Sequence, residues 1–188
     1  MRLFIAFDIP DGHRRGLDRA IDPVRLRLRG ARFIPPASWH VTLKFLGEVP
    51  EERFGEVRDV TAQSVEPFPR TRSRLTGLGA FPSARRARVV WVGLEDADGV
   101  LAALAEGMER DFAAAGFRRE ERVWRPHLTL ARFRTPGPIG EALAEARVED
   151  LPSEPFDVGE VVLFRSHLSP RGASYVPLDR FPLGPAQR

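Results

Sequence analysis

The 188-residue chain contains no cysteine. This absence excludes disulfide bonds, thiolate catalysis, iron–sulfur clusters and cysteine zinc sites. No apolar stretch approaches the roughly 18 residues that a helix needs to cross a bilayer. The N-terminal apolar run from Leu3 to Phe7 is followed by Asp8 and Pro10, and it is too short for a signal peptide. We therefore expect a cytoplasmic protein with no membrane segment.

Lysine is almost absent as well, because Lys44 is the only one and the other 28 of the 29 basic residues are arginine. The net charge is only +3, but the arginines are unevenly distributed. Residues 67–94 contain no acidic side chain and six arginines, namely Arg70, Arg72, Arg74, Arg85, Arg86 and Arg88. Such a cluster forms either a solvated face or a contact surface for an anionic partner such as RNA, since guanidinium binds phosphate well.

A composition of 43% hydrophobic and 29% charged residues is typical of a globular protein. The pattern of the chain predicts strands at 2–8, 39–47, 68–80, 87–94, 123–133, 157–166 and 173–181. It predicts helices at 12–29, from Pro50, from Asp96 to Gly116 and at 138–147. Pro23 should kink or split the first helix. This order indicates an α+β fold with antiparallel pairing, built as a single domain over residues 1–188.

One short motif occurs twice. Trp39-His40-Val41-Thr42-Leu43 is echoed 87 residues later by Pro126-His127-Leu128-Thr129-Leu130, and both copies lie in strand-like segments. Strand side chains alternate between faces, so each histidine shares a face with the threonine two residues on. Four histidines and six threonines in 188 residues give about 0.13 His-x-Thr matches by chance. A lone histidine on a strand is more often structural, but a matched pair favours a catalytic interpretation.

Two imidazoles and two hydroxyls around one cleft suit phosphoryl chemistry. A neutral imidazole can take a proton from an attacking hydroxyl or water, and an imidazolium can give one to the departing oxygen. The hydroxyls of Thr42 and Thr129 can donate to non-bridging phosphate oxygens. This chemistry needs neither a metal ion nor another cofactor. The residues alone do not decide whether His40 or His127 is the acid, because the reverse reaction exchanges the roles.

The two motifs resemble the paired HxTx signatures of the 2H phosphoesterase superfamily, and the surrounding sequence resembles its RNA 2′,3′-cyclic phosphodiesterase branch, also called the 2′-5′ RNA ligase family. The resemblance extends over residues 2–10, 44–49, 87–94, 131–132 and 163–181. It implies two pseudo-symmetric lobes with one motif in each. Two antiparallel sheets would flank a central groove, with helices on the outside.

The resemblance also implies an activity, namely hydrolysis of RNA 2′,3′-cyclic phosphate ends to 2′-phosphomonoesters. Carried over from the family, His40 is the proton donor and His127 the proton acceptor, while Thr42, Thr129 and Arg132 bind the substrate. The expected partners are RNA or oligonucleotides with 2′,3′-cyclic phosphate ends, with tRNA fragments as one candidate, and we expect a monomer.

Several other residues near the motifs have specific expected positions. Arg132 points away from His127 by strict alternation, so it needs a β-bulge or a strand end to reach the site. Lys44 has the same parity as His40, although solvent exposure is the simpler interpretation. We expect core positions for Phe7 and Phe45, with base stacking as the alternative. Trp39 and Trp124 are expected to pack, His13 and His167 to lie at the surface, and Tyr175 to be structural or to contact a ligand.

Three other functions compete with hydrolysis. The same site could catalyse 2′-5′ ligation, but water at about 55 M favours hydrolysis by mass action. A non-catalytic RNA-binding module would use the arginines, and loss of either histidine would then weaken binding without abolishing turnover. A metallohydrolase is disfavoured, because no HExxH or similar ligand cluster accompanies the histidines.

Overall fold

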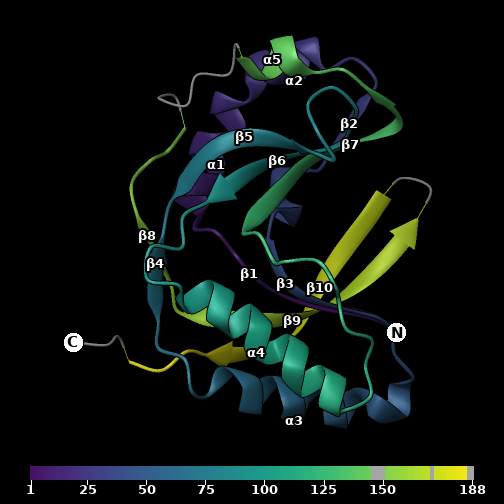
Figure 1. The fold of residues 1–188 in the computed structure, drawn as a ribbon, viewed down its shortest axis with the longest axis vertical. Helices are drawn as coiled ribbons and strands as arrows, with labels where there is room; N and C mark the ends of the chain where they lie inside the picture. The colour runs from purple at the N-terminus through teal and green to yellow at the C-terminus, as the bar shows by residue number, and fades with distance from the viewer. Residues whose placement is uncertain (145–150, 170–171, 186–188) are drawn as a thin grey trace.

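The computed structural model describes residues 1–144, 151–169 and 172–185, and its strands and helices are labelled in Figure 1. The strands are β1 (Arg2–Phe7), β2 (Ala31–Phe33), β3 (Val41–Glu48), β4 (Thr71–Ser73), β5 (Leu75–Phe81), β6 (Ala87–Leu94), β7 (His127–Gly137), β8 (Phe156–Val158), β9 (Glu160–Ser169) and β10 (Gly172–Pro182). The helices are α1 (Asp11–Ala20), α2 (Asp22–Arg27), α3 (Phe54–Val65), α4 (Val100–Ala114) and α5 (Gly140–Ala144). Short 3₁₀ turns cover Pro36–Ser38 and Glu51–Arg53.

The strands confirm the predicted α+β fold, in which the main strands form two antiparallel groups. One group has the order β10-β9-β1-β3, and the other has the order β7-β6-β5 with β2 also paired to β7. The two groups meet edge to edge through one antiparallel residue pair, Val41 with Leu128. Within the described residues they therefore form one continuous eight-stranded sheet. A separate two-stranded sheet pairs β4 with β8.

The helices cover the two strand groups at opposite ends of the molecule. Figure 1 shows α3 and α4 together at one end and α2 and α5 at the other, with the strands between them. Helix α4 packs on β3 through the stripe predicted from the sequence, which is completely buried and consists of Leu101, Leu104, Met108 and Phe112. Helix α2 buries Val24 against β6 and β7. Each motif strand is therefore held from behind by a helix-covered apolar core.

Several predicted boundaries differ from the observed ones. The predicted helix 12–29 is divided at Ile21, as Pro23 suggested. The predicted strands 68–80 and 157–166 are each two strands, because the chain changes sheets at Arg74 and at Gly159. The second motif strand begins at His127, one residue after Pro126, and runs to Gly137. Of the predicted helix 138–147, the structure shows α5, while residues 145–147 lie outside the described residues.

Candidate active site

The two sequence motifs lie on the two strands that join the halves of the sheet. Val41 on β3 pairs with Leu128 on β7, and both side chains are fully buried in the core. Because neighbours along a strand alternate between faces, His40 and Thr42 emerge opposite this core, as do His127 and Thr129. The pair of strands thus brings together, on one face of the sheet, two motifs that are 87 residues apart.

Each imidazole contacts the backbone carbonyl oxygen of the residue two positions before it. His40 Nδ1 lies 2.9 Å from the carbonyl oxygen of Ser38, and His127 Nδ1 lies 2.8 Å from the carbonyl oxygen of Arg125. A carbonyl oxygen can only accept, so in both rings Nδ1 carries the hydrogen and donates it. In the neutral rings Nε2 is therefore the free proton acceptor, and in the charged rings Nε2 is a proton donor.

His40 is packed among aromatic rings. Its ring centroid is 4.7 Å from that of Phe4 and 4.9 Å from that of Tyr175, which meets it edge-on. Burial is the main reason that the pKa of His40 is lowered to about 4, although the hydrogen bond to Ser38 opposes the shift. The positive charges of Arg132, Arg14 and His127 lower this pKa further. Since a charge on His127 acts on His40, the two imidazoles share one electrostatic environment.

His127 lies in a similar setting. Its ring centroid is 5.1 Å from that of Phe81 and 6.3 Å from that of Trp91. Burial lowers the pKa of His127 below its usual value of 6.5, the hydrogen bond to Arg125 opposes this, and the charge of Arg132 adds to the lowering. Both imidazoles are consequently neutral at pH 7 in the free protein, and a negatively charged ligand would raise both pKa values.

Each motif strand contains a β-bulge at the same motif position. In β3, Thr42 pairs with Ala6 and Lys44 with Ile5, which leaves Leu43 unpaired. In β7, Thr129 pairs with Trp91 and Ala131 with Val90, which leaves Leu130 unpaired. A bulge of one residue reverses the alternation that follows it. The position five residues after each histidine therefore turns to the histidine's own face.

This reversal places Arg132 on the same face as His127. The β-bulge that Arg132 was expected to need in order to reach the site is therefore present. The charge of Arg132 acts on His40, His127 and Tyr175 alike. The hydroxyls of Thr42 and Thr129 share this face, and neither has a hydrogen-bond partner within residues 1–144, 151–169 and 172–185. The structure thus brings all five sequence-predicted residues to one face of the sheet.

The same reversal in β3 makes two sequence predictions wrong. Lys44 is neither at the site nor exposed, because it is only 2% exposed and its Nζ lies 2.7 Å from Glu109 Oε2 on α4. Phe45 is not a core residue, because it is 62% exposed. Its ring centroid is 5.9 Å from that of Phe4. Phe45 lies five residues after His40, and this is the motif position that Arg132 occupies after His127.

Arg14 on α1 holds the backbone in front of His40, a role that the sequence pattern does not indicate. Its guanidinium donates to the carbonyl oxygens of Pro36 and Trp39, the latter at 3.0 Å. Asp8 and Asp11 lie 3.6 and 3.7 Å from the same guanidinium. Trp39 is the residue directly before His40, so Arg14 holds the backbone segment that leads into the first motif. No spacing or composition signal distinguishes Arg14 from the other arginines of α1.

The remaining predictions concern aromatic and histidine side chains. Phe7 and Trp39 are 1% exposed and confirm the expected core positions. Trp124 packs on the core and donates from Nε1 to the carbonyl oxygen of Thr42 at 2.9 Å. His167 is exposed as expected, although it lies on β9 rather than in a loop. His13 is half-buried rather than exposed, because its ring meets Phe156 edge-on at 4.9 Å.

The low pKa of His40 predicts a loss of stability in acid. The unfolded chain, with a histidine pKa near 6.5, binds a proton more readily than the folded chain, with its value of about 4. The free energy of unfolding should therefore fall as the pH falls from 6.5 to 4, by about 3 kcal/mol relative to a His40→Gln variant. Urea unfolding of both proteins at pH 7, 5.5 and 4 measures this difference. A parallel fall in the two proteins would contradict the expected coupling.

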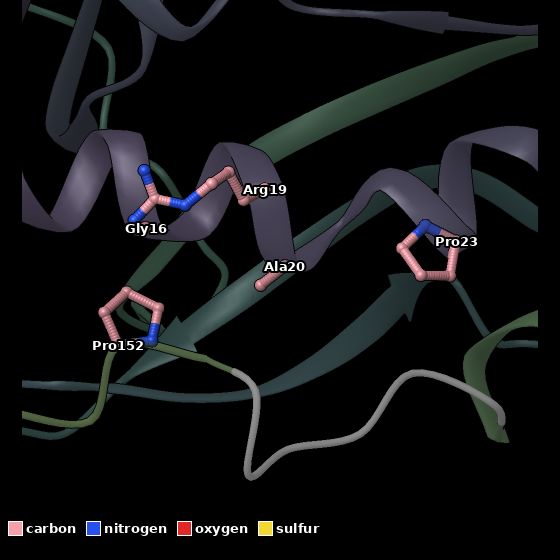
Figure 2. A pocket seen from close by; sticks show the side chains of 5 residues that line it. All are labelled: Gly16, Arg19, Ala20, Pro23 and Pro152. Atoms are coloured by element: carbon pink, nitrogen blue, oxygen red, sulfur yellow. The ribbon is translucent and has the colours of Figure 1, made fainter.

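A shallow hollow of about 450 Å³ lies elsewhere, against α1 and α2. Figure 2 shows Gly16, Arg19 and Ala20 on one side of it and Pro152 on the other. Among the described residues that line it, none belongs to β3 or β7, and Arg19 has the only charged side chain. In the described part of the chain, no three histidine, aspartate or glutamate side chains gather where they could hold a metal ion. No helix there is long and apolar enough to span a bilayer.

The chain resembles known proteins in both sequence and fold. A family model described as the 2′-5′ RNA ligase superfamily matches residues 13–170. An RNA 2′,3′-cyclic phosphodiesterase of Methanothermobacter thermautotrophicus is 31% identical over 186 residues, which cover 97% of this chain and 99% of the relative. A protein of the same name from Thermus thermophilus is 35% identical over 192 residues, which cover 97% of this chain and 90% of the relative.

Solved structures show the same likeness. TT0787 of Thermus thermophilus superposes with a TM-score of 0.81 at 31% identity, and the match covers 100% of both chains. LigT of E. coli, solved in complex with 3′-AMP, gives a TM-score of 0.74 at 25% identity, and the match covers 97% of each chain.

Proposed function

Because this chain belongs to the 2′-5′ RNA ligase superfamily, we propose that it is an RNA 2′,3′-cyclic phosphodiesterase that acts by two-histidine acid–base catalysis without a metal ion. The substrate would be an RNA end that carries a 2′,3′-cyclic phosphate, and the product a 2′-phosphomonoester. The relatives that are named RNA 2′,3′-cyclic phosphodiesterases support the activity. The proposal also treats residues 1–188 as one domain of two pseudo-symmetric lobes.

One observation carries the proposal. Two imidazoles emerge from adjoining strands onto one face, each with Nδ1 bound to the carbonyl oxygen two residues earlier and Nε2 free for proton transfer. The repetition of this bond, and of the bulge three residues after each histidine, supports a two-fold arrangement around the Val41–Leu128 pair. Such an arrangement would allow an acid and a base to act on opposite sides of a single phosphorus atom.

The proposed reaction follows from these positions. His127 Nε2 takes a proton from water as the water oxygen bonds to phosphorus. The bond from phosphorus to the 3′ oxygen breaks, and His40 Nε2 gives its proton to that oxygen, which leaves a 3′-hydroxyl and a 2′-phosphate. Thr42 and Thr129 donate to the non-bridging oxygens, and Arg132 offsets their negative charge. The exposed ring of Phe45 offers a surface on which an unpaired base could stack.

The two lowered pKa values predict an acidic optimum for kcat/KM. This parameter reports the free enzyme, whose productive form has one neutral and one charged imidazole. Its profile should be bell-shaped with an optimum below pH 6.5, between about 4 for His40 and the lowered value for His127. The kcat profile should lie at higher pH, because bound phosphate raises both pKa values. A kcat/KM that climbs steadily to pH 9 would contradict the assignment.

Product analysis tests the reaction itself. An oligonucleotide with a 2′,3′-cyclic phosphate end is incubated with the enzyme in EDTA, and the monoester is identified by chromatography against 2′- and 3′-phosphate standards. We expect the 2′-monoester alone, at a rate that EDTA does not change. A 3′-monoester would contradict the donor role toward the 3′ oxygen, and loss of activity in EDTA would indicate a metal-dependent enzyme.

A further inference from the structure

Two arginines lie directly opposite each other beside the proposed site. Arg32 on β2 pairs with Arg132 on β7 in an antiparallel ladder. Their neighbours Ala31, Phe33 and Ala131 pack into the apolar core behind the sheet. Arg32 therefore emerges on the same face as Arg132, and this is the face of the two motif histidines.

This pair is unfavourable on its own. Directly opposed residues have Cβ atoms about 5 Å apart, and two like charges in this position destabilise a sheet. Both side chains are exposed, and neither makes an ion pair or a hydrogen bond in the portion of the chain that the structure describes. Two other exposed strand arginines do have such partners, as Arg72 has in Asp157 and Arg180 in Glu160. An anion held between the two guanidinium groups would turn this repulsion into a favourable contact.

The two arginines differ in their distance from the imidazoles. The charge of Arg132 lowers the pKa values of His127 and Tyr175, whereas Arg32 is not among the charges that do so. Arg32 instead reaches toward the β9–β10 hairpin. Its Nη2 lies 2.6 Å from the position that a Cβ atom would have if residue 172 were not glycine. Arg132 is thus the inner arginine, and Arg32 lies at the outer rim of the same face.

We propose that Arg32, together with Arg132, binds the 5′-phosphate of the terminal nucleotide, which is the phosphodiester that joins it to the rest of the RNA. This assignment rests on the proposed function, because it takes the reacting cyclic phosphate to lie between the imidazoles. The next negative charge on the substrate is then the 5′-phosphate, and Arg32 is the cation directly across the ladder from Arg132. Arg32 would make the enzyme prefer an RNA end to a free nucleoside 2′,3′-cyclic phosphate.

The test compares two substrates that differ only in this phosphate and what it carries. Adenosine 2′,3′-cyclic phosphate lacks it, whereas the dinucleotide adenylyl-(3′,5′)-adenosine 2′,3′-cyclic phosphate contains it. For Arg32→Gln we expect KM for the dinucleotide to rise about 10- to 100-fold and kcat/KM for the mononucleotide to stay within about two-fold. Arg32→Lys should recover part of the loss, and Arg72→Gln on β4 is the matched control.

Two further measurements separate substrate binding from a structural role. In Arg32→Gln, the slope of log KM for the dinucleotide against log salt should decrease by about 0.7, as expected for one lost contact to single-stranded RNA. The melting temperature should not fall, because the change removes a like-charge pair. Unchanged KM for the dinucleotide, or an equal loss on both substrates, would overturn the assignment.

A binding experiment keeps this inference separable from the proposed reaction. Dissociation constants are measured for adenosine 2′-phosphate and for the dinucleotide that ends in a 2′-phosphate, neither of which requires turnover. If the wild type binds the dinucleotide more tightly and Arg32→Gln removes that difference, the assignment stands even if no hydrolysis is found. If the wild type hydrolyses both cyclic substrates but Arg32→Gln leaves the difference intact, the assignment fails and the proposed function remains.

Discussion

Replacing His127 with alanine is expected to lower kcat on an oligonucleotide with a 2′,3′-cyclic phosphate end at least about 100-fold, and up to about 10⁴-fold. The free Nε2 of His127 is the proposed acceptor for the proton of water, and its Nδ1 is held by the carbonyl oxygen of Arg125. Without the imidazole, the water must attack without a base. KM should change less than kcat, since Thr129 and Arg132 would still bind the phosphate. Steady-state kinetics on the purified variant measures both parameters.

The variant His40→Ala should show a loss of similar size, because the departing 3′ oxygen would lack its donor. The double variant should lose little more than either single variant, since the two imidazoles act in the same step. His167→Ala is the matched control, as this histidine is exposed on β9, and it should retain wild-type rates. Turnover near the wild-type level in the double variant would refute two-histidine catalysis, and weakened binding with no effect on turnover would favour an RNA-binding role.

The second large effect concerns stability. Lys44→Met should lower the free energy of unfolding by about 3–5 kcal/mol, because removal of one partner leaves the other charge buried and unpaired. The Lys44 ammonium is almost completely buried between β3 and α4, where it donates to Glu109 Oε2 and, at 2.9 Å, to the carbonyl oxygen of Arg118. The Glu109 side chain is itself only 15% exposed. Urea unfolding at pH 7 measures the loss.

The double variant Lys44→Met/Glu109→Leu should recover much of that stability, since an apolar pair of similar volume needs no desolvation of charge. Its kcat should match the wild type, because the bulge at Leu43 turns Lys44 away from the imidazoles. A double variant less stable than Lys44→Met would contradict the buried-pair explanation. A stable double variant without activity would indicate that Lys44 takes part in catalysis after all.

Much of the fold could be predicted because the relevant signals are local. The alternation of apolar residues predicts strands at β1, β3, β6 and β7. The helical spacing of apolar residues predicts each buried position of the α4 stripe. The sequence predicts a single strand for each of the segments 68–80 and 157–166, since nothing local shows that β4 pairs with β8 while β5 and β9 join the main sheet. A change of sheet is a property of the partner strands, and it leaves no periodic signal.

The site shows the same division at the level of single residues. The parity of His40 with Thr42, and of His127 with Thr129, follows directly from the motif. Beyond Thr42, parity along the strand predicts the wrong face for Lys44 and Phe45. The bulge at Leu43 inserts one extra residue into β3, and the composition of the strand does not reveal it. The equivalent bulge at Leu130 gives Arg132 the orientation that strict alternation denied it.

The sequence by itself determined the two motifs, the residue types they present and the family to which they are similar, because these are carried by contiguous residues. Only the tertiary structure decided that β3 and β7 adjoin, which carbonyl oxygens fix the imidazole tautomers, how far burial lowers the pKa values, and that Arg32 stands opposite Arg132. Each of these depends on groups that are distant in the chain, and their contacts exist only when the strands have paired.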